Sequence, residues 1–227
     1  MLEKLKESVL WANLELVRHG LVMHTWGNAS GRDPETGLIV IKPSGISYDV
    51  MKASDMVVVD QEGRVVEGGY KPSTDTATHL VLYKAYPYIG GVVHTHSTYA
   101  TSWAQAGKDI PAFGTTHADH FYGEVPCSRR LTPDEIGTDY EINTGRVIIE
   151  RIGKMDALSV PSVLVYSHGP FSWGIDVEDA VYNAEALEEI ARMAFYTVLL
   201  GRKEPADKEL IEKHFTRKHG SDAYYGQ

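Results

Sequence analysis

Short apolar runs alternate with amphipathic helical patterns along most of this chain. Strands are expected at runs rich in β-branched residues, namely 38–41, 56–60, 65–66, 91–94 and 162–166. Helices are expected where apolar residues recur at helical spacing, namely 2–17, 76–86, 97–105, 176–200 and about 206–218. This alternation predicts an α/β fold in which helices cover a sheet. The pattern does not determine whether neighbouring strands are parallel or antiparallel.

The length and composition of the chain favour a single compact domain. The 227 residues are 43% hydrophobic, which is enough to bury a sizeable core. No internal repeat, low-complexity linker or change of composition divides the sequence. We therefore expect one domain over residues 1–227.

Charge and cysteine content exclude several classes of partner and site. The net charge is −9 and the Lys and Arg residues are scattered, so nucleic acid is not expected as a partner. The N-terminal segment 1–7 alternates charged and apolar residues, which predicts neither a signal peptide nor a membrane span, and a cytoplasmic location is expected. Cys127 is the only cysteine, so a metal would have to be bound by histidines and carboxylates.

Two expected strands end in histidines, which points to a metal centre. His94 and His96 lie two residues apart at the end of the run 91–94, so both imidazoles face the same side. His168 follows the run 162–166 and precedes a Gly-Pro turn signal. Three histidines and one oxygen ligand suit a catalytic zinc ion with an open coordination position. A pair of packed, hydrogen-bonded core histidines is the alternative for His94 and His96.

The oxygen ligand is less certain from the residues alone. Asp75 precedes a helical pattern, so it is a candidate metal ligand and equally a candidate helix N-cap. His79 lies one turn further along that helix and is a rival ligand or a hydrogen-bonded core residue. The residues alone leave both alternatives open.

Three segments carry small and hydroxylated residues that suit the binding of an anion. They are 26–30 (Trp-Gly-Asn-Ala-Ser), 42–45 (Lys-Pro-Ser-Gly) and 73–74 (Ser-Thr). Backbone N–H groups can approach a phosphate closely at such positions, and Lys42 adds a positive charge. Taken singly, each segment is also compatible with an ordinary turn.

Two further polar segments suggest proton transfer and assembly. His117, Asp119 and His120 form a dense cluster that could supply a general acid or base, although a polar loop is the alternative. The chain ends in Tyr224 and Tyr225, and this aromatic terminus suits docking on another subunit.

The combination and order of these segments resemble the 4-epimerase branch of the class II aldolase and sugar-phosphate epimerase family. The resemblance covers nearly the whole chain and is specific because all segments occur together. The matching segments are 25–28, 41–45, 71–75, 93–97, 114–119, 167–170 and 223–227.

The resemblance implies a fold, an assembly and a set of site residues. The fold is a three-layer α/β/α sandwich around a mainly antiparallel sheet, and the assembly is a homotetramer with active sites between subunits. The implied zinc ligands, with one ion per subunit, are Asp75, His94, His96 and His168. The implied substrate-binding residues are Gly27, Asn28, Lys42, Ser44, Gly45, Ser73 and Thr74. The implied acid and base are Asp119 and Tyr225. Apart from the resemblance, His214 on the last expected helix is expected to accompany Tyr225.

The activity implied is zinc-dependent epimerisation at C4, converting L-ribulose 5-phosphate to D-xylulose 5-phosphate in L-arabinose catabolism. The C3–C4 bond would break in a retro-aldol step and re-form on the other face of the aldehyde. Thr74 departs from the Ser usual in these epimerases, but it keeps the hydroxyl. Related aldolases carry Glu at the position of Asp75, so the shorter Asp favours epimerisation. The alternatives are an epimerase for L-xylulose 5-phosphate, a sugar-phosphate aldolase, or a non-catalytic metal- or sugar-phosphate-binding protein.

Overall fold

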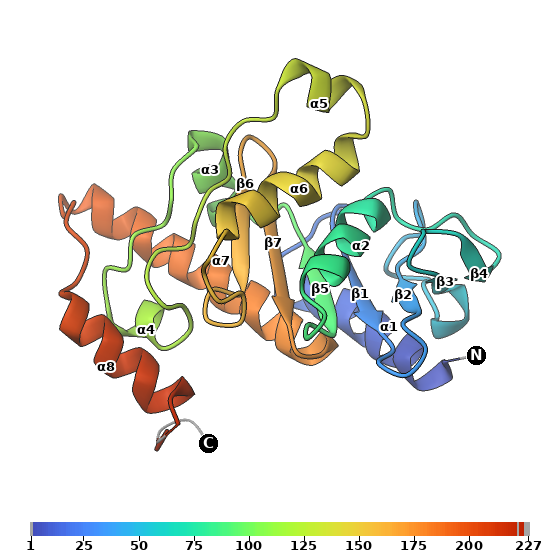
Figure 1. Cartoon of the computed structure of the whole chain (residues 1–227), viewed down its shortest axis with the longest axis horizontal. Helices are drawn as coiled ribbons and strands as arrows, with labels where there is room; N and C mark the ends of the chain where they lie inside the picture. Colours follow the sequence, from blue (N-terminus) through green and yellow to red (C-terminus); the bar gives the residue numbers. More distant parts are fainter. Residues whose placement is uncertain (1, 222, 225–227) are drawn as a thin grey trace.

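The protein is described by a computed structural model that covers residues 2–221 and 223–224 (Figure 1). The longer helices are α1 (Glu3–Arg18), α2 (Thr76–Ala85), α3 (Thr98–Ala106), α6 (Tyr140–Ile152), α7 (Val177–Leu199) and α8 (Lys208–His219). The short ones are η1 (Ala53–Asp55), α4 (Thr115–Ala118) and α5 (Pro133–Gly137). The strands are β1 (Asn28–Arg32), β2 (Ile39–Ile41), β3 (Val57–Val59), β4 (Val65–Glu67), β5 (Gly91–His94), β6 (Ser162–Val165) and β7 (Gly169–Gly174).

The strands form one seven-stranded sheet in the order β4-β3-β2-β1-β5-β7-β6. All neighbouring strands of this sheet are antiparallel. In the register, His94 of β5 lies opposite Asn28 of β1 on one side and opposite Phe171 of β7 on the other. This pairing places the polar ends of β5 and β1 next to each other, with Phe171 on the other side of His94.

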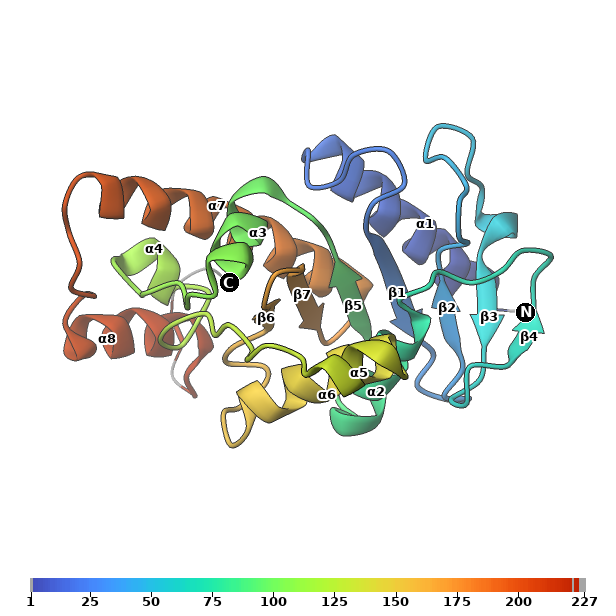
Figure 2. The same cartoon turned by 90° about the horizontal axis from the view of Figure 1, so that it is seen from above.

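Helices cover both faces of the sheet, which gives three layers (Figure 2). On one face, side chains of α2 and α6 such as Leu82 and Ile148 pack on Ile41 and Val163. On the other face, side chains of α1 and α7 pack on the strand residues that point to that side of the sheet, including Val93. The alternation of inward-facing positions along each strand explains why both faces are apolar. The expected three-layer α/β/α sandwich with an antiparallel sheet is confirmed.

A third apolar cluster lies at the end of the molecule that carries α3, α4 and α8 (Figure 1). Phe121, which follows α4, is fully buried there against side chains of α3 and α7. Helix α4 packs on α8, so the C-terminal helix is joined to this end of the molecule rather than to the sheet. In the part of the chain that the structure describes, no helix has the length and apolar character needed to cross a membrane.

Candidate metal centre

Strand β5 carries His94 and His96 to the edge of a cavity. His94 is its last residue and is buried, whereas His96 lies two residues further and is exposed. Both imidazoles face the same cavity because side chains alternate in an extended chain. The Nε2 atoms of the two rings are 3.1 Å apart.

The hairpin between β6 and β7 brings His168 to the same place. Its turn includes Ser167, whose φ of 58° lies in the left-handed region. The hairpin then continues through Gly169, where an added Cβ would lie 2.7 Å from the carbonyl oxygen of Thr95. Glycine therefore permits the close approach of β7 to the end of β5. As a result, the ring centroids of His94 and His168 are only 4.7 Å apart.

His94, His96 and His168 can offer one ligand nitrogen each, with all three nitrogens within 4.8 Å of one another. His94 donates from Nδ1 to the carbonyl oxygen of Pro170 at 2.9 Å, because a carbonyl can only accept. The Nε2 lone pair of His94 is thereby directed toward the other two rings. Its ring also stacks on Phe171, with centroids 4.1 Å apart.

The three imidazoles are neutral at neutral pH. Burial lowers the pKa of His94 to about 3. Burial also lowers the pKa values of His96 and His168. Metal binding requires the neutral form of histidine, so protons do not compete with a cation at this site near pH 7. The donor set fits a divalent cation.

Asp75 lines the same cavity. Its carboxylate oxygens are not among the ligand atoms that lie within 4.8 Å of one another. It is the N-cap residue of α2, yet its side chain makes no capping hydrogen bond. Instead, its Oδ2 atom accepts a hydrogen bond of 2.7 Å from Asn28 Nδ2. Burial disfavours the charged form of Asp75, but the neighbouring imidazoles and Asn28 outweigh it and lower the pKa of this carboxyl. The carboxylate therefore faces the cavity in its charged form.

His79 belongs to the core behind the cavity rather than to its wall. It is fully buried, and its Nδ1 atom lies 2.7 Å from Ser30 Oγ, which in turn contacts the hydroxyl of Tyr83 at 2.9 Å. The ring also meets the edge of Phe171. Of the two sequence alternatives for His79, the structure agrees with the hydrogen-bonded core residue.

The cavity has a volume of about 530 Å³ and joins the histidines to all three anion-binding candidate segments. Its lining includes every predicted substrate-binding residue, namely Gly27, Asn28, Lys42, Ser44, Gly45, Ser73 and Thr74. The segment 73–74 is held beside 42–44 by backbone hydrogen bonds, from Ser44 N to Lys71 O and from Ser73 N to Lys42 O. The loops from three parts of the chain therefore form one wall.

Lys42 supplies a buried positive charge to this wall. Its side chain is 2% exposed. Its ammonium donates to the carbonyl of Pro43 at 3.3 Å and lies 4.9 Å from the centroid of the Tyr48 ring. Burial lowers the pKa of Lys42 because it removes water from around the charged ammonium group. A poorly solvated ammonium attracts an anion more strongly than one in water.

Of the two predicted proton-transfer residues, Asp119 does not line this cavity. Asp119 follows α4 and is bound to α8, where His214 Nδ1 is 3.1 Å and Arg217 is 3.0 Å from its carboxylate. Burial disfavours its charge, but the hydrogen bonds from Arg217 and His214 outweigh this and lower the pKa of Asp119. Tyr225 lies outside the described residues.

Sequence reasoning missed two residues of the cavity wall, Tyr140 and Glu141. Both stand at the start of α6, in a stretch where no helix was expected. Tyr140 is half-buried, and its hydroxyl lies 3.3 Å from His168 Nδ1. The apolar periodicity of 140–152 was the signal that could have located this helix, since Val147, Ile148 and Ile152 are buried on one face.

Glu15, His19 and Glu185 form a second group of possible ligands on α1 and α7. His19 Nε2 already lies within 3.3 Å of both carboxylates, and Arg18 contacts Glu15. None of the three residues lines the cavity described above. The contacts among these side chains and with Arg18 account for this group.

Comparison with known protein families identifies the family of this chain. The model of the family "Class II Aldolase and Adducin N-terminal domain" matches residues 7–195, which is most of the chain. The chain belongs to this family. The family predicted from the order of the sequence segments is thereby confirmed.

Curated relatives resemble the chain over its whole length. A protein of Salmonella paratyphi C named "L-ribulose-5-phosphate 4-epimerase UlaF" is 58% identical over 227 residues, covering 100% of both chains. The protein of the same name from Salmonella typhi has the same identity and coverage.

Solved structures agree with the fold. An L-fuculose 1-phosphate aldolase superposes with a TM-score of 0.80 at 27% identity, covering 94% of this chain and 95% of the other. YgbL of Escherichia coli, described as a putative aldolase/epimerase/decarboxylase, gives a TM-score of 0.75 at 24% identity, with coverage of 94% and 98%. At that identity, the second likeness bears on the fold alone.

Proposed function

We propose that this chain is a zinc-dependent enzyme that epimerises L-ribulose 5-phosphate at C4 to D-xylulose 5-phosphate. The observation that carries the proposal is one cavity that unites three neutral imidazoles with a buried lysine and hydroxyl-bearing loops. Such a cavity suits a substrate that needs both a Lewis acid and a phosphate anchor. The full-length identity of 58% to proteins named for this activity supports the choice of substrate.

The metal would be held by His94, His96 and His168, with Asp75 as the oxygen ligand. Three nitrogen donors and one carboxylate oxygen suit zinc and leave a coordination position for substrate. When bound, a divalent ion supplies Lewis acidity to the C2 carbonyl and C3 hydroxyl oxygens as the C3–C4 bond breaks. Asn28 supports this role of Asp75 because its amide holds the carboxylate toward the cavity.

The phosphate would be anchored on the opposite wall by Lys42, Ser44, Gly45, Ser73, Thr74 and the amide groups around Gly27 and Asn28. These residues supply hydroxyl and backbone donors together with one cation. The anchor retains the two-carbon aldehyde fragment after bond cleavage. Retention allows the fragment to turn its other face to the three-carbon fragment before the bond forms again, which inverts C4.

Proton transfer at the C4 oxygen is assigned to Asp119 and Tyr225. One group accepts the proton when C3–C4 cleaves, and the other returns a proton on the opposite face. Asp119 is held away from the cavity of its own chain by α8. We therefore propose that Asp119, with His214 beside it, acts in the site of a neighbouring subunit within a homotetramer. Tyr225 is expected to reach the same site.

The main rivals are an aldolase, which would release the two fragments, and an epimerase acting on L-xylulose 5-phosphate. A non-catalytic binding protein would bind sugar phosphates without converting them. Cytoplasmic location and a role in L-arabinose breakdown stay predictions. Nucleic acid is not proposed as a partner, given the net charge of −9.

A single incubation separates these activities. The purified protein is incubated with L-ribulose 5-phosphate, and with L-xylulose 5-phosphate in parallel, and the products are resolved chromatographically. We expect D-xylulose 5-phosphate to form from the first substrate without release of glycolaldehyde phosphate. The variant His96→Ala serves as the control because it lacks a proposed ligand. Release of dihydroxyacetone and glycolaldehyde phosphate without formation of D-xylulose 5-phosphate would identify an aldolase, and no conversion of either substrate would refute the proposal.

A further inference from the structure

Tyr140 connects α6 to the histidine cluster. Its hydroxyl oxygen lies 3.3 Å from His168 Nδ1, and the two ring centroids are 6.1 Å apart. Its side chain also forms part of the cavity wall. No role in the retro-aldol chemistry described above has been given to this residue.

The Tyr140 contact bears on which nitrogen of His168 carries the proton. A neutral imidazole has one nitrogen that donates and one that accepts. His94 shows the arrangement on a neighbouring ring, because its Nδ1 donates to the Pro170 carbonyl and its Nε2 faces the cluster. For His168 the phenol oxygen of Tyr140 takes the position that the Pro170 carbonyl takes for His94. In this arrangement the Tyr140 side chain would accept a hydrogen bond from His168, as the Pro170 backbone carbonyl accepts one from His94.

We propose that Tyr140 is a positioning residue of the metal centre, whose phenol oxygen accepts a hydrogen bond from His168 Nδ1–H and fixes Nε2 as the metal-binding nitrogen. This inference rests on the proposed function in that it takes His168 as a metal ligand. Partners of this kind orient metal-bound imidazoles and raise their affinity for the metal. The residue would act through His168 rather than on the reacting atoms.

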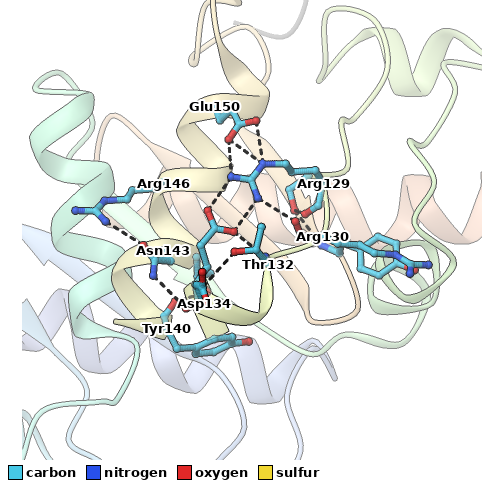
Figure 3. Close-up of polar contacts among 12 residues, drawn as sticks. Arg129, Arg130, Thr132, Asp134, Tyr140, Asn143, Arg146 and Glu150 are labelled. Carbon is cyan, nitrogen blue, oxygen red and sulfur yellow. Dashed lines mark hydrogen bonds and ion pairs between the residues drawn. The ribbon is translucent and has the colours of Figure 1, made fainter. Parts of the chain in front are cut away.

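Polar contacts hold helix α6, which begins at Tyr140, in a defined place. Tyr140 is the first residue of α6, and Figure 3 shows the polar contacts that tie this helix to α5. Arg129 forms ion pairs with Glu135 of α5 and Glu150 of α6, at 2.8 and 2.9 Å. Asn143 Nδ2 donates to the carbonyl oxygen of Glu135 at 3.0 Å. In Figure 3 the Tyr140 ring extends away from this network, which leaves its hydroxyl free of those ion pairs.

The test is the variant Tyr140→Phe in the full-length protein, which removes the phenol oxygen alone. The variant keeps both main-chain hydrogen bonds of this residue. Its N–H donates to Thr138 O, and its carbonyl oxygen accepts from Thr144 Oγ1. We expect zinc affinity to fall by about 10- to 100-fold, measured by competition with a chromogenic chelator. In protein loaded with cobalt(II), we expect the visible absorption bands to shift, because the His168 ring is no longer held.

Tyr86→Phe is the matched control, since it also deletes one tyrosine hydroxyl. That hydroxyl is buried beside Trp173 and has no hydrogen-bond partner among the described residues. Its removal should leave both metal readouts unchanged. Unfolding of the metal-free proteins in denaturant checks that each variant is as well folded as the parent.

The outcomes separate this inference from the proposed function. If the parent protein binds no divalent metal, the proposed function fails together with the inference. If the parent binds zinc and Tyr140→Phe binds it equally, with an unchanged cobalt spectrum, the positioning role alone is wrong. A change confined to kcat or KM, with both metal readouts unchanged, would assign Tyr140 to the substrate and would also overturn the inference.

Discussion

The imidazoles of His94, His96 and His168 are neutral and close together, so each one is expected to contribute directly to the affinity for metal. Replacing any of them by Ala removes one of few ligands. We expect His94→Ala, His96→Ala and His168→Ala to retain far less than one divalent ion per chain, measured by elemental analysis after dialysis. Asp119→Asn should retain its metal, because Asp119 is bound to α8. Unchanged metal content in all three His variants would refute the ligand set.

Asn28 and Lys42 are expected to contribute to substrate binding in both the ground state and the transition state. A hydrogen bond to a charged group contributes about 1.5–3 kcal/mol, which corresponds to roughly 10- to 100-fold in affinity. Asn28→Ala and Lys42→Met should therefore raise KM by about that factor, with a smaller fall in kcat. Steady-state kinetics over a range of sugar-phosphate concentrations measure both constants. A large fall in kcat at constant KM would instead place these residues in the chemical step.

His79 makes the stability of the metal-free protein depend on pH. Burial lowers the pKa of His79 to about 4, below the ordinary value of 6.5. The unfolded state therefore binds more protons between these two pH values. The contribution of His79 to stability is complete above about pH 6.5 and is lost as the pH falls toward 4.

Chemical denaturation at pH 6.5 and 4.5 measures this contribution. The free energy of unfolding should fall on acidification, and a single group with this pKa shift accounts for about 2 kcal/mol of the fall. For the variant His79→Gln, the fall in the free energy of unfolding should be smaller by about 2 kcal/mol. Equal losses in the two proteins would show that folding does not lower the pKa of His79.

At the scale of secondary-structure elements, the histidine-bearing strand β5 and the strand β6 before His168 were predictable, because their apolar runs match buried strands. Strands β1 and β7 were not, since Asn-Ala-Ser-Gly-Arg and Gly-Pro-Phe-Ser-Trp-Gly carry residues that disfavour strands in isolation. Both lie in the middle of the sheet, where neighbours on either side provide the pairing that local propensity does not.

The candidate site, too, was only partly predictable from local sequence. The metal ligands and anion-binding residues could be proposed because they occur in recognisable segments with chemically informative residue types. Without the family resemblance, the Asp75 alternatives could not be resolved, because the hydrogen bond from Asn28 joins residues 47 positions apart. Tyr140 was missed because its role depends on the packing of α6 beside the β6–β7 hairpin, a contact between distant segments.

The start of β1 requires glycine at position 27. Its φ of 83° lies in the left-handed region, and an added Cβ would lie 2.7 Å from the carbonyl oxygen of His94. Gly27→Ala should therefore lower the free energy of unfolding by about 2–4 kcal/mol, through backbone strain and overlap together. The measurement is urea denaturation of the metal-free protein.

Gly45→Ala is the control, since Gly45 has a similar φ of 74° but no atom within 4 Å of an added Cβ. Gly45→Ala should lower the free energy of unfolding by only about 1 kcal/mol, through backbone strain alone. Equal losses for the two variants would mean that the contact with His94 does not restrict this strand.

At the scale of the whole molecule, the separation of Asp119 from the cavity predicts that activity requires more than one chain. Asp119→Asn and His96→Ala should each be inactive alone. When the two are unfolded and refolded together, some interfaces should pair an intact metal centre with an intact Asp119, and partial activity should return. Mass spectrometry verifies that mixed oligomers have formed. Verified mixed oligomers without activity would mean that each chain completes its own site.

The most direct measurement of the central claim is a titration of metal-free protein with zinc in the presence of L-ribulose 5-phosphate. The proposed function predicts that D-xylulose 5-phosphate appears only when zinc is added, that the rate saturates near one ion per chain, and that glycolaldehyde phosphate does not accumulate. Formation of D-xylulose 5-phosphate at the full rate by verified metal-free protein would contradict it.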